Sequence, residues 1–485
     1  MSEHEKARAP RSRWRRTLGF VPDLLVVATV ALAFLAWHFD LGTRWGLAAP
    51  DPATEPALVL PPEGLALPVQ RAAAEVAKPL ESSQASPSAV ARTVRKLLAD
   101  RRLGTHVDVL VTDLETGEPL YRQGSGTVTP ASTMKLLTSL AALEAIGPDH
   151  RFETTVRRVP GTNRIVLVGG GDPFLQSRPT TQDFYPHRAD IQSLARRAGR
   201  ALRADGTRKV RLAYDDSFFS GPRTPKYWPA SYLRDGVVPP ITALWVDEGR
   251  SPTGFGYVDD PSRAAGVAFR AALAKQGIRV VGELAHQKAP GGARDLALVQ
   301  SPTLGQIVAR LVLVSDNNAA EVVAHHVGKA VRSDASFAGG ALAVRSVLHK
   351  LGVPLEDAVI RDGSGLSRAN RLQPRTLTEV LRLDASADHP ALREVATGMP
   401  VAGFSGSLEF RFDTGATAGR GRVQAKTGTL TGVHGLAGVA TDLDGNVMGF
   451  VAIADRVPNA QQLYARLTID KMAAALGACR CGTGT

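Results

Sequence analysis

Three short motifs in this chain of 485 residues carry side chains that can perform acyl-transfer chemistry. They are Ser132-x-x-Lys135, Ser315-x-Asn317 and Lys426-Thr427-Gly428, and each occurs once. Only 12 of the 58 basic residues are lysine, which makes a lysine-containing motif harder to meet by accident. With average residue usage, the number of matches expected by chance is roughly one half for Ser-x-x-Lys and below about one tenth for Lys-Thr-Gly. We therefore interpret the three motifs as parts of one site.

Ser132 and Lys135 have the spacing of a nucleophile and its base. Residues three apart lie about one turn apart on the same face of a helix. A serine hydroxyl becomes a good nucleophile when a base takes its proton, and a lysine can do so when it is neutral. Burial and a second nearby cation, which Lys426 could supply, lower the pKa of a lysine. We expect Lys135 to face inward as the base, rather than to be a solvated charge on a helix surface.

The second motif offers groups for moving a proton and for holding an amide. Ser315, on a loop between helices, could relay a proton to a leaving amine, and the Asn317 amide can both donate and accept hydrogen bonds. The backbone N–H groups of Ser132 and Thr429 are natural donors for an oxyanion hole. This set is suited to attack on an amide carbonyl.

The third motif is suited to binding a terminal carboxylate. Lys426 and Thr427 offer a charge and a hydroxyl from a predicted edge strand, and Gly428 leaves room for a substrate to lie along that strand.

The elements that must position the three motifs can be predicted from periodicity and turn residues. We expect helices near 89–103, 130–147, 190–205, 261–277 and 303–314, a mostly helical stretch from there to about 400, and a helix from 460. Strands are expected near 106–123, 152–159, 164–175, 209–219, 295–301, 422–430, 434–443 and 447–455.

The three motifs, taken together, resemble those of serine penicillin-binding proteins and β-lactamases. In class A β-lactamases and the smaller carboxypeptidases the first two motifs lie close together, whereas here Ser315 follows Ser132 by 183 positions and precedes Lys426 by 111. The resemblance therefore implies a domain inserted after the Ser132 helix. On these motifs the chain resembles the peptidase S13 family of D-alanyl-D-alanine carboxypeptidases and endopeptidases, over roughly residues 90 to 475. Four accessory stretches also resemble that family: 169–175, 215–219, 361–371 and 405–412.

The resemblance implies an α+β fold like that of the β-lactamases and penicillin-binding transpeptidases, with an antiparallel sheet flanked by helices and an inserted α/β domain. It implies a serine D,D-carboxypeptidase, and possibly a D,D-endopeptidase, that forms an acyl-enzyme on Ser132, removes terminal D-alanine from peptidoglycan stem peptides and is inhibited covalently by β-lactams. No metal or organic cofactor is expected. A catalytically slow penicillin-binding or wall-binding scaffold and a transpeptidase are the alternatives. A β-lactamase would need a deacylating base, and no Glu-x-x-Asn follows Ser315.

The N-terminus reads as a targeting signal, with a cluster of arginines before an apolar run. We expect a retained membrane anchor, or else a cleaved signal peptide, that places the body of the protein on the extracytoplasmic face of the plasma membrane. The formal charge of +12 is explained by this flank and an arginine-rich surface, so nucleic acid is not expected as a partner.

The predicted segments are a cytoplasmic basic segment (1–17), the anchor or signal (18–39), a Pro/Ala-rich spacer (40–88), the first part of the penicillin-binding domain (89–149), the inserted domain (150–290) and the second part (291–478).

Four other patterns are weaker. Gly169 to Asp172 favours a tight turn over a phosphate loop, since no helix opens after it. His325 and His326, with Glu321 one turn earlier, favour a packed helix over a metal site, because adjacent histidines point to different faces of a helix and no further ligand is evident. Asp362 and Ser364 are interpreted as structural rather than as part of a catalytic-serine site, since the Gly-x-Ser-x-Gly spacing is missing. The family resemblance implies that they lie in a loop behind the active site. Cys479 and Cys481 are interpreted as tail cysteines without a structural task, with a local disulfide or redox pair as the alternative.

Overall fold

The computed structural model describes residues 29, 84–180 and 185–482. Apart from Thr29, these residues belong to one compact unit of the chain, Pro79–Thr485. The predicted anchor or signal at 18–39 and the spacer up to residue 83 lie outside the described residues, Thr29 excepted. In the described ranges no helix combines the length and the apolar composition that a membrane span needs.

The first sheet has five antiparallel strands in the order β2-β1-β11-β10-β9. Their bounds are β1 Val107–Asp113, β2 Pro119–Gln123, β9 Val423–Leu430, β10 Val433–Thr441 and β11 Val447–Ala454. Side chains alternate between the two faces, so along β11 Phe450 and Ala452 enter one hydrophobic core while Val451 and Ile453 enter another. The sheet is therefore buried on both faces.

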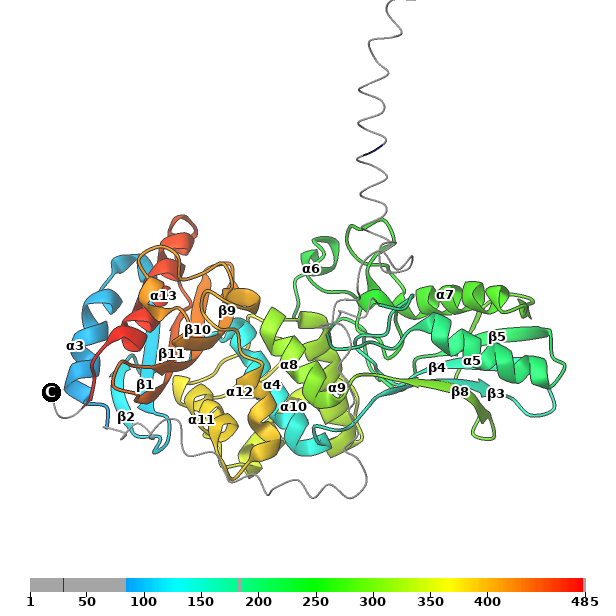
Figure 1. Cartoon of the computed structure of the whole chain (residues 1–485), viewed down its shortest axis with the longest axis horizontal. Helices are drawn as coiled ribbons and strands as arrows, with labels where there is room; N and C mark the ends of the chain where they lie inside the picture. The colour runs from blue at the N-terminus through cyan, green and yellow to red at the C-terminus, as the bar shows by residue number, and fades with distance from the viewer. Residues whose placement is uncertain (1–28, 30–83, 181–184, 483–485) are drawn as a thin grey trace, which may run out of the picture. The chain divides into compact units, whose positions relative to one another are not determined.

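Helices cover both faces of this sheet, as Figure 1 shows. The core on one side is shared by α3 (Pro87–Leu98) and α13 (Gln462–Ala478). The core on the other side is built by the remaining helices of this part and contains most of α4. Those helices are α4 Met134–Ile146, α8 Leu304–Val314, α9 Asn317–Arg332, α10 Phe337–Lys350, α11 Pro374–Ala385 and α12 Arg393–Thr397.

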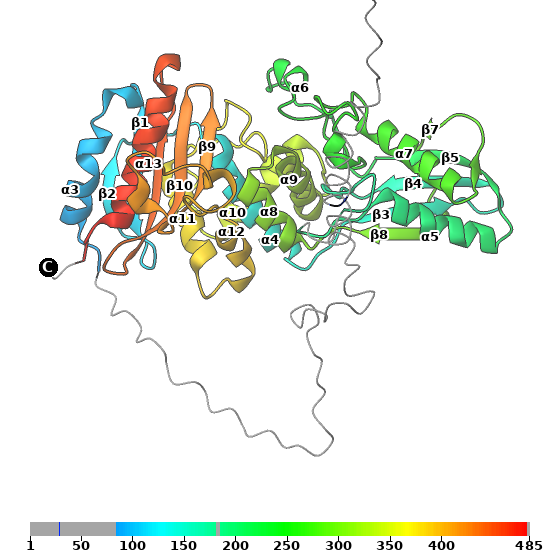
Figure 2. The same cartoon turned by 45° about the horizontal axis from the view of Figure 1, so that its top comes forward.

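The second sheet lies in the segment inserted between α4 and α8. It has the strand order β6-β5-β4-β3-β8, with β7 also paired to β5. The bounds are β3 Glu153–Arg158, β4 Arg164–Gly169, β5 Lys209–Asp215, β6 Arg279–Val280, β7 Ala285–His286 and β8 Arg294–Gln300. The helices α5 (Ile191–Ala204) and α7 (Pro261–Lys275) share one core with this sheet (Figure 2). The predicted α+β fold with an inserted α/β part is thus what the structure has.

One predicted strand has a different place from the one we expected. We expected residues 295–301 to begin the second part of the penicillin-binding domain, but β8 pairs antiparallel with β3 at the edge of the second sheet. Alternation of side chains identifies a strand without naming its partner, so the sequence did not reveal this pairing. The chain returns to the first part only after Ser301, whose hydroxyl accepts the N–H of Phe152 at 2.9 Å.

The short elements complete the description. The helix α6 spans Ser231–Arg234 in the inserted part. Single 3-10 turns are found at Arg101–Leu103, Ala131–Thr133, Asp247–Gly249, Pro390–Leu392, Gly406–Leu408, Thr417–Gly419 and Asn459–Gln461.

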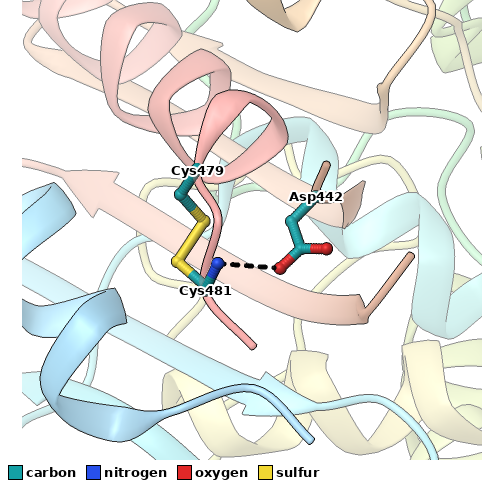
Figure 3. A group of neighbouring side chains, drawn as sticks. All are labelled: Asp442, Cys479 and Cys481. Carbon is teal, nitrogen blue, oxygen red and sulfur yellow. Dashed lines mark hydrogen bonds between the residues drawn. A yellow bond between two sulfur atoms is a disulfide. The ribbon is translucent and has the colours of Figure 1, made fainter. Parts of the chain in front are cut away.

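The C-terminal residues return to the first sheet, where the two cysteines are bonded to each other. The sulfur atoms of Cys479 and Cys481 form a disulfide (Figure 3). Cys481 is buried in the core with α3 and α13, and its N–H donates to the Asp442 carboxylate at 3.3 Å. Its carbonyl accepts the Ser86 N–H at 2.6 Å. The interpretation as tail cysteines without a structural task is therefore corrected, because this tail packs into the core instead of leaving the fold.

Candidate active site

Ser132 lies in a single 3-10 turn, Ala131–Thr133, that leads directly into α4. Ala131 has a left-handed backbone with a φ of 48°, a conformation that costs a residue with a side chain roughly 1 kcal/mol or more. Gly365 packs against this turn so closely that a Cβ atom on it would lie 1.8 Å from the Ala131 carbonyl oxygen. The half-buried Ser132 is therefore presented on a backbone that its neighbours hold in place.

Lys135 faces inward, as the spacing predicted, and is fully buried. Its Nζ lies 2.9 Å from Ser132 Oγ, 2.8 Å from Asn317 Oδ1 and 2.7 Å from the Ser364 carbonyl oxygen. Burial lowers the pKa of Lys135 from 10.5 to about 8, although the charges of nearby carboxyl groups, Glu321 first, oppose the shift. The amine is thus within hydrogen-bond reach of the serine and is neutral more often than an exposed lysine.

The Ser315-Asp316-Asn317 motif forms the corner between α8 and α9. Ser315 ends α8 with a left-handed backbone, and the Asp316 carboxylate caps α9 by accepting the Ala319 N–H at 3.0 Å. This corner points Ser315 Oγ at Lys426 Nζ, 2.7 Å away, while Asn317 points at Lys135. The motif therefore bridges the two lysines.

Lys426 is the second fully buried amine, and it comes from β9. Burial is the main cause that lowers its pKa well below the ordinary value, and the positive charges of Lys135 and Arg411 lower it further. The sequence analysis named burial and the charge of Lys426 as causes that would lower the pKa of Lys135. Burial is the main cause of the shift, and the mutual repulsion of the two buried amines disfavours the state in which both are protonated.

The remaining third-motif residues lie along an edge of the first sheet, because β9 is the last strand in its order. Gly428 fits there because a Cβ atom would approach the Pro130 carbonyl oxygen to 2.8 Å, so β9 passes directly beside the turn that carries Ser132. Thr427 Oγ1 lies 3.3 Å from Lys426 Nζ and 3.3 Å from Ser407 Oγ. Thr429, the next residue but one, is exposed. All eight residues singled out from the sequence thus lie on the three segments that meet at Ser132.

Glu321 is a residue of this site whose place the sequence analysis missed, since we considered it only as a metal ligand. It is fully buried on α9, and its carboxylate accepts the N–H groups of Gly363 at 3.1 Å and Ser364 at 2.8 Å. The Ser364 carbonyl in turn accepts from Lys135. Burial, helped by the charge of Asp362, raises the pKa of Glu321 to about 8. A signal was present: Glu321 follows Asn317 by four residues and therefore shares its helix face.

The loop 361–371, predicted to lie behind the active site, is fastened to the inserted part through Asp362. The Asp362 carboxylate accepts from Trp228 Nε1 at 2.8 Å and from the Gly365 N–H at 2.9 Å. The Tyr227 hydroxyl donates to the Arg361 carbonyl. The carbonyl of Val237, also in the inserted part, lies 3.5 Å from Asn317 Nδ2. Side chains of the insertion therefore help to build this site.

His325 and His326 are both buried within the helical packing. His325 Nδ1 lies 2.7 Å from the Glu321 carbonyl oxygen, and His326 Nε2 lies 2.8 Å from the Gly171 carbonyl oxygen in the turn predicted at 169–172. Within the ranges that the structure describes, three possible metal ligands come together only at Asp442, Cys479 and Cys481. Two of these are joined as a disulfide and so offer no thiolate.

The fold and the geometry together define a class. An antiparallel sheet flanked by helices, with a serine beside one buried lysine and a second lysine on the edge strand, is the arrangement of the active-site serine enzymes that include penicillin-binding proteins and β-lactamases. The model of the D-Ala-D-Ala carboxypeptidase 3 (S13) family matches residues 90–257 and 253–476. The chain belongs to this family and is a serine-type D-Ala-D-Ala carboxypeptidase.

Individual relatives agree with this assignment. The chain is 34% identical over 489 residues to carboxypeptidase DacB of Mycolicibacterium smegmatis, which covers 97% of this chain and 99% of the relative. It is 28% identical over 460 residues to a D-alanyl-D-alanine carboxypeptidase of an Actinomadura species, covering 76% and 81%. Penicillin binding protein 4 of Haemophilus influenzae has a similar structure, with a TM-score of 0.65, 21% identity and coverage of 80% of this chain and 98% of that one. Because the sequence identity is only 21%, this structural similarity is evidence for a shared fold alone.

Proposed function

We propose that Ser132 is the nucleophile of this carboxypeptidase and that Lys135 is its general base. The observation that carries the proposal is the 2.9 Å separation of Lys135 Nζ from Ser132 Oγ in a buried setting that lowers the pKa of Lys135 to about 8. A base with a pKa near the working pH combines a useful fraction of neutral amine with the ability to take a proton. The Asn317 and Ser364 oxygens hold this amine in place.

The reaction then has two halves. Neutral Lys135 takes the hydroxyl proton while Ser132 Oγ bonds to the carbonyl carbon between the two D-alanines of a peptidoglycan stem peptide. The negative charge that forms on the oxygen of the attacked carbonyl is stabilised by the backbone N–H groups of Ser132 and Thr429. The proton that Lys135 took is relayed through Ser315 to the leaving nitrogen, the C–N bond breaks, D-alanine leaves and Lys135 is neutral again. Lys135 then takes a proton from a water molecule, whose oxygen bonds to the ester carbonyl carbon. The proton on Lys135 passes to Ser132 Oγ as the ester C–O bond breaks, which frees the enzyme.

Substrate recognition is assigned to the edge strand and the second motif. The terminal carboxylate is held by Lys426 and Thr427, and its negative charge favours the protonated form of the Lys426 amine. The Asn317 amide has its oxygen directed at Lys135, and of the two N–H groups on Nδ2 one faces the Val237 carbonyl, so the other can donate to a substrate carbonyl. Gly428 allows the peptide to lie against β9.

Two further properties follow from the same acyl-enzyme. Cleavage of D,D cross-links uses identical chemistry with a larger leaving group, so an endopeptidase activity is included in the proposal. A β-lactam offers a strained amide to Ser132 and would acylate it. Penicillin binding protein 4 of H. influenzae has been solved in complex with a β-lactam. Because peptidoglycan lies outside the plasma membrane, we place the protein at the extracytoplasmic face, sent there by the predicted segment 18–39.

Mass spectrometry of the penicillin-treated full chain tests the proposal. We expect one adduct with the mass of one penicillin, located in the peptide that contains Ser132. An adduct on another residue contradicts the assignment. Release of D-alanine from a pentapeptide, measured in parallel, separates a working carboxypeptidase from a scaffold that is acylated but turns over no peptide.

Glu321→Gln is expected to move the acidic limb of the pH–rate profile to lower pH. The ionised Glu321 carboxylate raises the pKa of Lys135, so replacing it with a neutral isostere lets the amine lose its proton at lower pH. Because the pKa of Glu321 is itself raised to about 8, its carboxyl group is partly protonated over this limb, and the shift should be below about one pH unit. Glutamine still accepts one of the two N–H bonds from Gly363 and Ser364, which limits the structural change. An unmoved limb, with only a lower rate, would mean that Glu321 supports the loop without affecting the base.

Gly365→Ala is expected to lower the rate of Ser132 acylation by about 10²-fold, since displacement of a reacting group by about 1 Å has a cost of that size. The new Cβ would lie 1.8 Å from the Ala131 carbonyl oxygen and must displace the nucleophile turn. Gly352→Ala is the matched control, because Gly352 has a similar φ of 76° and no atom within 4 Å of the added Cβ. Both variants bear left-handed strain, so an equal loss of rate in both would attribute the effect to backbone strain alone.

A further inference from the structure

A groove outside the catalytic motifs is enclosed by three segments of the chain. One wall is α10, the second is the stretch 221–227 of the inserted part, and the third is the stretch 358–361 that leads into the Asp362 loop. Its volume is about 770 Å³. This lies within the range of roughly 300 to 1,000 Å³ that small-molecule sites occupy. None of the residues that line it belongs to the three motifs.

The floor of the groove is apolar. It is formed by Phe337, Ala338, Ala341, Leu342, Val359 and Ile360. Leu342 is 52% exposed, so part of this apolar lining faces solvent. Binding of a ligand that removes this apolar surface from water is favourable.

The charged side chains that line the groove are all positive. They are Lys226, Arg345 and Arg361, and no acidic residue lines it. In the described part of the chain none of the three forms an ion pair with a carboxylate. Arg345 is held in position by the Ala358 carbonyl oxygen, which accepts from its Nη1 at 2.6 Å. An apolar floor with three uncompensated cations around it is complementary to a molecule with an apolar body and an anionic group.

We propose that this groove is a binding site for an amphipathic anion, namely a small acid with a hydrocarbon or aromatic body, such as a medium-chain fatty acid. The body lies on Phe337, Ala341 and Leu342, and the acid group meets Arg345 and its neighbouring cations. A charged head needs such partners where its surroundings are apolar. A protein partner fits less well, because specific interfaces usually bury about 800 Å² on each side and this site is a walled hollow. The proposal does not depend on the catalytic roles assigned above.

Titration of the full chain with 1-anilinonaphthalene-8-sulfonate, an aromatic sulfonate whose fluorescence rises in apolar sites, tests the proposal, with laurate as competitor. We expect one saturable site that laurate empties. Leu342→Asp and Arg345→Glu should each weaken binding at least tenfold, while Arg345→Lys should retain most of it. Leu463→Asp is the matched control, since Leu463 is 54% exposed on α13 and should leave binding unchanged.

Several results would overturn the proposal. One is unchanged probe binding by the Leu342 and Arg345 variants, and another is the absence of saturation in the wild type. A third is loss of the bound probe after penicillin has acylated Ser132, because the probe would then lie in the catalytic cleft. Gel filtration could give a fourth result against the proposal. If the wild type is a dimer and Leu342→Asp dissociates it, the groove is an interface between two copies of the chain. The variants should release D-alanine at the wild-type rate, which shows that they are folded.

Discussion

Ser132→Ala is expected to release no D-alanine above background and to take up no penicillin. Removing the nucleophile of a serine hydrolase lowers turnover by roughly 10⁶-fold. The substitution also removes one hydrogen-bond partner of Lys135, whose Nζ keeps the Asn317 and Ser364 oxygens, so the fold should be preserved. Residual turnover and covalent labelling by intact-mass measurement check the result.

Two controls make this result interpretable. Ser139→Ala changes a buried serine seven residues after Ser132 on α4 and should leave labelling at the wild-type level, because the Ser139 hydroxyl forms no hydrogen bond within the described residues. Thermal unfolding of both variants should be close to that of the wild type. Penicillin uptake by the Ser132→Ala protein would show that the nucleophile has been assigned to the wrong residue.

Lys135→Met is expected to reduce acylation by about 10² to 10⁴-fold, the range that general-base catalysis supplies. Methionine approximates the length of the chain while removing the amine, so Ser132 stays in place without a proton acceptor. Lys350→Met, at the exposed end of α10, is the matched control and should acylate normally. Stopped-flow acylation by a chromogenic cephalosporin measures the difference. A loss below tenfold would indicate that another group takes the proton.

The same variant gives a second, independent signature in its stability. The pKa of Lys135 falls from 10.5 to about 8 on folding, so the unfolded chain binds this proton more tightly. The contribution of Lys135 to stability therefore rises as the pH rises from 8 to 10.5 and is lost as the pH falls through that window. At about 1.4 kcal/mol for each pKa unit, it amounts to about 3 kcal/mol. The difference in unfolding free energy between wild type and Lys135→Met should change by that order across the window.

The sequence was sufficient for the parts of the site that depend on local spacing. Ser132 and Lys135 are three residues apart on one helix, and the chemistry of their side chains limits what such a pair can do. The single copy of each motif linked them to Ser315 and Lys426 without any knowledge of the fold. The hairpin of β1 and β2 was also predictable, because alternating residues flank a turn at Glu115 to Gly117.

The parts that were missed depend on contacts between residues far apart in the chain. Glu321 contacts Gly363 and Ser364 more than forty positions later, and Trp228 reaches Asp362 across 134 positions. Neither pairing has a signature in composition or periodicity. The partner of β8 and the burial of Cys481 were missed for the same reason. Such details are determined by packing, which a single sequence does not display.

The order of strands in the first sheet has a consequence for how the protein is made. The strand β1 pairs with the central strand β11, and the bond between His106 and Asp455 joins residues 349 positions apart. During synthesis the nucleophile helix emerges long before the strands that cover it. Folding with such high contact order is slow and leaves apolar strands open to aggregation in the meantime. We expect the inserted sheet, whose strands lie within 153–300, to form first, and catalytic competence to arise only when the last strand is added.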